Sequence, residues 1–147
     1  MQYLITGDRG FIGSHLFNTL KLKLDNEGGQ FIDDAIFGID KVLGLDILNP
    51  KTYDRIAEWE DFNGPIDIIY HLAGQTSVQD SIKDKTQDAK DNILTMIALI
   101  ERFPNAKVIY TQTSACVPDK GKIGQIIDVL KGKSYIPSSP YGLSKKT

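Results

Sequence analysis

The sequence predicts an α/β protein with a doubly wound parallel sheet and helices on both of its faces. Two observations carry this prediction. Short apolar runs alternate with longer segments in which apolar residues recur at helical spacing, and the first apolar run leads straight into a glycine-rich turn. Strands that alternate with helices are typical of parallel sheets, because each helix carries the chain back to begin the next strand in the same direction. The length of 147 residues fits one domain.

Each predicted strand is a short apolar run, and five are expected: 2–6, 35–40, 42–45, 66–72 and 107–111. Each predicted helix shows apolar residues at helical spacing or a proline in its first turn. These helices cover 11 to about 26, 50–59, 88–103 and 139–147. Glycines interrupt the stretch 116–138, where only 123–130 indicate a short helix. The mixed charges of 80–91 indicate a solvated face.

The composition excludes several classes of protein. A formal net charge of -2 and a pI of about 5.6 argue against a nucleic-acid binder without sequence preference, since such proteins carry a basic excess. Cys116 is the single cysteine, so no internal disulfide or cysteine zinc cluster is expected, and the two separated histidines indicate no metal site. The chain opens without a charged-then-apolar leader, and its apolar runs are shorter than the roughly 18–20 residues of a membrane span. We therefore expect a cytoplasmic protein.

Three glycines, Gly7, Gly10 and Gly13, punctuate the turn between the first predicted strand and the first helix. At a dinucleotide site Gly7 would permit the tight turn, Gly10 would let the backbone approach a diphosphate, and Gly13 would let the helix lie close to the sheet. The helix N-terminus would then present N–H groups and the positive end of its dipole to the phosphates. The first gap is one residue longer than in the usual pattern, and a glycine-rich turn without a ligand is the alternative.

Asp40 ends the second predicted strand. A carboxylate at this place can accept hydrogen bonds from both hydroxyls of an adenosine ribose and would repel a 2′-phosphate, so Asp40 predicts NAD rather than NADP. Asp33 and Asp34 are competing candidates, but they precede the strand. A solvated loop aspartate is the other interpretation.

Tyr141 and Lys145 stand four residues apart, so on a helix they share a face. An ammonium beside a phenol favours the phenolate, which makes Tyr141 a candidate general base. Ser114 follows the predicted strand 107–111, at the sheet edge where ligands bind in open α/β folds, and could donate to a developing carbonyl oxygen. Taken alone, the Tyr/Lys pair is more often a solvated helix face.

With these residues in place, the sequence resembles the extended short-chain dehydrogenase/reductases, and within them the nucleotide-sugar epimerases of the UDP-glucose 4-epimerase type. The resemblance rests on six motifs that span nearly the whole chain in order: TGDRGFIGSHL, GIDK, HLAGQTSV, NILTMIALIE, YTQTSACV and SPYGLSK. It implies a Rossmann-like fold that binds NAD and acts on a nucleotide sugar.

The resemblance also assigns residues. The implied catalytic residues are Ser114, Tyr141 and Lys145. The implied cofactor-binding residues are Gly7, Gly10, Phe11, Ile12, Gly13, Asp40, Lys41, Asp46, Ile47, Leu72, Ala73, Gly74, Thr76, Asn92, Tyr141 and Lys145.

The residues after Ser114 bear on the type of reaction. Nucleotide-sugar 4,6-dehydratases carry acids after the catalytic hydroxyl, whereas Ala115 and Cys116 stand here. Water elimination needs a general acid beside the substrate, so this segment favours 4-epimerisation through a 4-keto intermediate. A dehydratase or reductase of the same superfamily and a non-catalytic NAD-binding module are the alternatives.

The chain ends two residues after Lys145, whereas family members run to about twice this length and use their second half to bind the sugar nucleotide. The resemblance therefore implies an incomplete domain, truncated after the Tyr/Lys helix begins, and a chain that binds NAD without turnover when alone. It also implies pairing of two copies through helices after the fourth and fifth predicted strands. Only the first of these helices is complete here, so a homodimer is one open expectation.

Overall fold

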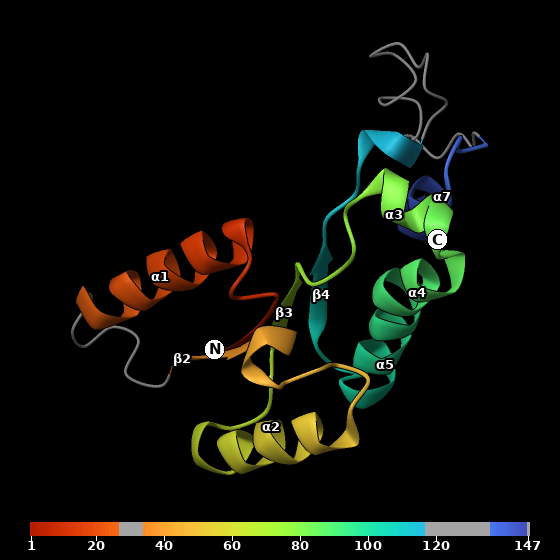
Figure 1. Cartoon of the computed structure of the whole chain (residues 1–147). Coiled ribbons are helices and arrows are strands. Elements are labelled where there is room, and N and C mark those ends of the chain that lie inside the picture. Colours follow the sequence, from red (N-terminus) through yellow and green to blue (C-terminus); the bar gives the residue numbers. More distant parts are fainter. Residues whose placement is uncertain (27–33, 117–135, 147) are drawn as a thin grey trace. The chain divides into compact units, whose positions relative to one another are not determined.

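The computed structural model describes residues 1–26, 34–116 and 136–146, and they divide into two compact units. The first, called the sheet unit, comprises residues 1–73 and 96–110. The second, called the helical unit, comprises residues 74–95 and the described residues from 111 onward. Figure 1 labels most of the strands and α-helices of both units.

The sheet unit is built on four parallel strands in the order β2-β1-β3-β4. The strands are β1 (Gln2–Thr6), β2 (Ala35–Ile39), β3 (Ile68–His71) and β4 (Lys107–Tyr110). Leu4, in the middle of β1, pairs with Phe37 of β2 on one side and with Ile69 of β3 on the other. Four of the five predicted strands are therefore confirmed, with small differences at their ends.

Helices cover both faces of this sheet. The connection through α1 (Phe11–Asn26) runs from β1 outward to β2, whereas α2 (Pro50–Asn63) and α5 (Thr95–Arg102) lie in connections that run the opposite way. Because parallel crossovers are right-handed, the reversal places α1 on one face and α2 with α5 on the other. The direction changes between β1 and β3, and ligands bind at the carboxyl ends of strands at such a point. The fold is Rossmann-like, as predicted.

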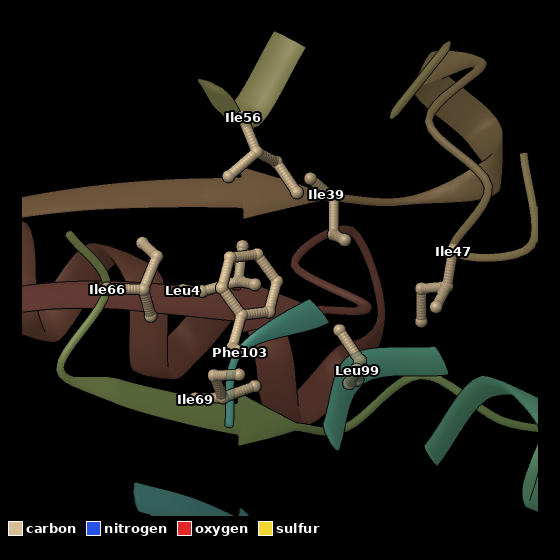
Figure 2. Packing of buried hydrophobic residues seen from close by; sticks show 8 residues of the cluster. All are labelled: Leu4, Ile39, Ile47, Ile56, Ile66, Ile69, Leu99 and Phe103. Carbon is tan, nitrogen blue, oxygen red and sulfur yellow. The ribbon is translucent and has the colours of Figure 1, made fainter. Parts of the chain in front are cut away.

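The core lies on the face covered by α2 and α5 (Figure 2). Its members are Leu4, Ile39, Ile47, Ile56, Ile66, Ile69, Leu99 and Phe103. Leu4 and Ile69 come from neighbouring strands and Leu99 from α5, and all three are fully buried. Full burial of one such side chain contributes about 1.5–3 kcal/mol relative to exposure. This cluster therefore fixes the strands whose ends carry the site.

The predicted strand at 42–45 is wrong. Lys41–Leu43 form a short 3-10 helix, η1, in which no residue is buried. Asp40 caps it, because Asp40 Oδ1 accepts a hydrogen bond from the Val42 N–H at 3.0 Å, and Gly44 ends it at a φ of 73°. Val42 is 82% exposed. Within this run Leu45 packs against the core, whereas Val42 and Leu43 are exposed. The run therefore follows the local side-chain cap instead of pairing as a strand.

The helical unit contains short elements. They are α3 (Val78–Lys83), α4 (Lys85–Ala89), the π-helix η2 (Lys90–Leu94), the 3-10 helix η3 (Ser114–Cys116) and α7 (Pro140–Lys146). The helix predicted at 139–147 is confirmed as α7. The helix predicted at 88–103 begins earlier and contains the π-turn η2 before α5, and π-turns are frequent at functional sites. The short helix predicted at 123–130 lies outside the described residues.

Candidate functional site

The glycine turn lies between β1 and α1 in the sheet unit. Gly7 has a φ of 73°, in the left-handed region that favours glycine, and a Cβ there would lie 2.8 Å from the backbone nitrogen of Ala73. A Cβ at Gly13 would overlap the carbonyl oxygen of Gly7. The first turn of α1 therefore packs directly on the turn that leaves β1, as a dinucleotide site requires.

The start of α1 is open to a ligand. Gly10, Phe11 and Ile12 are exposed, and Phe11 is 83% exposed. The first turn of α1 carries no acidic side chain, so no carboxylate of that turn competes with a phosphate for the positive end of the helix dipole.

Asp40 is held beside this turn. One carboxylate oxygen accepts from the Val42 N–H, and the other accepts from the Arg9 N–H of the glycine turn at 3.2 Å. These bonds fix the carboxylate at the end of β2, where the ribose of an adenosine would be recognised.

The remaining predicted residues of the sheet unit have different positions. Lys41 and Asp46 form an ion pair at 3.6 Å, and Asp46 also accepts from the Leu48 N–H at 2.9 Å. The side chain of Ile47 is 4% exposed and belongs to the core, so it offers a ligand only its backbone. A role for Ile47 beside an adenine stays a prediction.

Leu72 and Ala73 follow β3 and lie against Gly7. Thr6 orders this loop, because its Oγ1 lies 2.7 Å from His71 Nδ1 and accepts from the Ala73 N–H at 3.1 Å. The Leu72 N–H donates to the Thr6 carbonyl at 3.2 Å. The backbone of the loop after β3 is thus fixed next to the turn after β1.

Asp8 is a residue of this site that the sequence analysis missed. It is 4% exposed, and its Oδ1 has no hydrogen-bond partner among the described residues. The side chain occupies the space left by the missing Cβ of Gly38, and Arg9 Nε lies 3.4 Å from its Oδ2. Burial raises the pKa of the Asp8 carboxyl above its usual value, with the nearby charge of Asp40 adding to the rise and Arg9 opposing it. An acidic residue inside a glycine turn is the signal that could have identified it.

In the helical unit, α7 carries the Tyr/Lys pair. Tyr141 is 9% exposed and Lys145 is 5% exposed, so the alternative of a solvated helix face is wrong. The Tyr141 N–H donates to Ser81 Oγ at 3.2 Å and ties α7 to α3. Both side chains are therefore largely removed from solvent.

Ser114 reaches the same helix through its neighbour. A Cβ at Gly142 would overlap the carbonyl oxygen of Ala115, so η3 and α7 lie in direct contact. Ser114 itself is exposed and precedes Ala115, and Tyr141 precedes Gly142. Ser114 and Tyr141 are therefore the chain neighbours of two residues, Ala115 and Gly142, whose backbones are in contact.

Gly74, Asn92 and Lys145 meet in the helical unit. A Cβ at Gly74 would fall on Asn92 Oδ1 and lie 3.3 Å from Lys145 Nζ. Asn92 is 2% exposed, and its amide donates to the Gln75 carbonyl at 3.1 Å. Its Oδ1 has no hydrogen-bond partner among the described residues. Burial lowers the pKa of Lys145, and the charges of Asp88 and Cys116 oppose that shift.

Further observations limit the site. Thr76 is exposed between Gln75 and Ser77, and its predicted cofactor contact stays a prediction. Across residues 1–26, 34–116 and 136–146 no three histidine, cysteine, aspartate or glutamate side chains gather as metal ligands would. Within the same ranges no helix is long and apolar enough to cross a bilayer.

The glycine turn after β1, the acid after β2 and the buried Tyr/Lys pair define a dinucleotide-dependent α/β fold of the short-chain dehydrogenase type. The chain belongs to the NAD-dependent epimerase/dehydratase family, whose sequence model matches residues 3–147.

Known proteins similar to this chain are enzymes of nucleotide sugars. A dTDP-D-glucose 4,6-dehydratase of Dictyostelium discoideum is 32% identical over 98% of this chain and 38% of its own length. A UDP-glucose 4-epimerase of Mycolicibacterium smegmatis is 31% identical over 80% of this chain and 40% of its own length. The solved UDP-glucose 4-epimerase of Thermus thermophilus in complex with NAD superposes with a TM-score of 0.72 at 22% identity, over 99% of this chain and 48% of that one. The chain thus spans less than half the length of these proteins.

Proposed function

We propose that this chain binds NAD and forms the cofactor-binding part of a nucleotide-sugar 4-epimerase. The observation that carries the proposal is the buried pair Tyr141 and Lys145 on α7, packed against an η3 that consists of Ser114, Ala115 and Cys116. The pair supplies a base for a sugar hydroxyl, and η3 supplies a hydroxyl without a carboxylic acid.

The residues of the sheet unit fit NAD. The turn at Gly7 and Gly10 presents backbone to a diphosphate, and the exposed start of α1 faces no acid of its own first turn. Asp40 is fixed for a ribose diol, and its carboxylate would repel a 2′-phosphate. This carboxylate favours NAD over NADP.

In the proposed reaction Tyr141, as phenolate, takes the proton of the sugar 4-hydroxyl. NAD, held by the glycine turn and Asp40, would supply the acceptor and the donor of a hydride at C4, so that a 4-keto sugar could form and be reduced again on its other face. Lys145 stabilises the phenolate, and Ser114 donates a hydrogen bond to the 4-keto oxygen. Tyr141 then gives its proton back to that oxygen. The overall reaction therefore neither takes up nor releases protons or electrons.

The test is to incubate the protein that carries this chain with NAD and UDP-glucose and to look for UDP-galactose. Tyr141→Phe removes the base and should lower kcat by at least about 10²-fold, in the range of general acid–base catalysis. Tyr53→Phe, on α2 and outside the proposed site, is the matched tyrosine control. Equal rates in both variants would contradict the role of Tyr141.

A 4,6-dehydratase is the second candidate, because the Dictyostelium relative carries that name. The segment after Ser114 weighs against it, since elimination of water needs an acid beside the substrate. Formation of a 4-keto-6-deoxy sugar in the same incubation would replace epimerisation by dehydration as the proposed reaction.

The proposal also includes the oligomeric state and the location of the protein. Ile97 and Ile100 on α5 are about half exposed, which supports pairing of two copies. Light scattering should then give twice the chain mass, and a monomer at high concentration would contradict the homodimer. A cytoplasmic location stays a prediction.

A further inference from the structure

A buried carboxylate lies in the helical unit where the sequence indicated a solvated face. Asp88 on α4 is 1% exposed. Its Oδ1 accepts from the Asn92 amide at 3.0 Å, and its Oδ2 accepts from Ser144 Oγ at 2.6 Å. Asp88 is therefore hydrogen-bonded both to Ser144, which precedes Lys145, and to the side-chain amide of Asn92, which lies beside Gly74.

The same place holds a buried cation. Lys145 is 5% exposed and directly follows Ser144, whose hydroxyl is bound to Asp88. Burying a lone ammonium or carboxylate is costly, and the cost falls when the two charges lie close together. The two buried charges have opposite sign, and the charge of Asp88 favours the charged form of Lys145.

The other charged groups on the elements around α7 are less suited than Asp88 to act as the buried counter-charge of Lys145. Cys116 on η3 is buried and also acts on the lysine charge, but its side chain is a thiol and not a carboxylate. The remaining groups are exposed or half-buried: Asp80, Lys83, Asp84, Lys85, Lys90, Asp91 and Lys146. Asp88 is thus the buried anion among the described residues of these elements.

We propose that Asp88 is the buried counter-charge of Lys145 and so a positioning residue for the Tyr141–Lys145 pair. It holds the ammonium charged, and it orients the start of the lysine through Ser144. The proposal rests on the proposed function, because it gives the lysine a task beside Tyr141. It deepens that function by naming the group that keeps the lysine protonated in a buried site.

The first test follows the lysine by NMR. The pKa of Lys145 is read from its ¹³Cε shift in the whole chain, and the resonance is assigned with Lys145→Met. Asp88→Asn keeps the shape of the side chain and removes its charge, so the pKa of Lys145 should fall further by on the order of one unit. Ser144→Ala is the matched control, because it removes one hydrogen bond to Asp88 and keeps the charge. An unchanged lysine titration in Asp88→Asn would overturn the proposal.

The second test covers the case in which Asp88→Asn does not fold. In the double variant Asp88→Asn/Lys145→Met both buried charges are gone, so it should be more stable than the less stable single variant. Recovery of folding in the double variant supports the pairing, and failure to recover overturns it. Neither test uses NAD or a sugar, so their outcome is independent of the epimerase assay.

Discussion

Asp8 combines two unfavourable features in a single residue, a buried carboxylate and an oxygen without a hydrogen-bond partner among the described residues. Its pKa is raised above the usual value, mainly by burial. Between the ordinary and the raised pKa the folded chain binds more protons than the unfolded chain, so this residue makes stability fall as pH rises through that window.

Asp8→Asn should therefore raise the melting temperature at pH 7 by a few degrees. The substitution removes the buried charge, and the lost pair with the exposed Arg9 is worth little. The gain should shrink toward pH 4, because a raised pKa makes the Asp8 carboxyl lose its charge at a higher pH than an ordinary aspartate does. Thermal melts at the two pH values measure this, with the exposed Asp61→Asn as control. A lower melting temperature for Asp8→Asn at pH 7 would show that the charge stabilises the fold.

Gly7 and Gly44 offer a matched pair of substitutions. Both have a φ of 73°, but a Cβ at Gly44 would meet nothing within 4 Å, whereas one at Gly7 would meet the backbone of Leu72 and Ala73. Gly44→Ala should cost about 1–2 kcal/mol of unfolding free energy for the left-handed backbone alone. Gly7→Ala should cost clearly more, because two backbone segments must also move apart. Urea unfolding of both variants measures the difference, and equal costs would argue against the close packing of the turn on the loop after β3.

At the scale of single elements, η1 shows how a local cap outweighs apolar character. Asp40 both caps η1 and presents its carboxylate beside the glycine turn. Asp40→Ala should therefore cost about 0.5–2 kcal/mol of stability and also weaken NAD binding.

The matched control is Asn49→Ala, which removes the side-chain cap of α2 and lies outside the proposed ribose site. It should lower stability by a similar amount and leave the Kd for NAD unchanged. Denaturant unfolding and calorimetry on both variants separate the two roles. If both variants lost NAD affinity equally, the effect of Asp40 would be structural.

Elements with their own strong pattern could be predicted from the sequence. β1, the glycine turn and α7 each have a clear sequence pattern within a few residues, and the structure confirms these elements. The strand predicted at 42–45 is wrong because apolar character alone does not distinguish a strand from a short helix held by a side-chain cap. Asp88 was missed for the converse reason, since a charged residue among charged neighbours looks solvated. Its burial depends on Ser144, which lies 56 residues away in the sequence.

At the scale of the whole molecule, the predicted site residues fall into two groups, one in each unit. The sheet unit holds the glycine turn and Asp40, beside Asp8, which was not predicted, and the helical unit holds Asn92, Tyr141 and Lys145. The predicted residues could be named from the sequence because each motif requires a particular local backbone conformation. The sequence could not predict which of them are buried, since burial is decided by packing between distant segments.

The proposed function requires that this chain bind NAD in preference to NADP. Isothermal titration calorimetry of the 147-residue chain with each dinucleotide measures this preference. If the glycine turn and Asp40 act as proposed, NAD should bind in the micromolar range and NADP far more weakly, with the difference reduced in Asp40→Asn. Equal affinity for both dinucleotides, or binding of neither, would contradict the roles given to the glycine turn and Asp40.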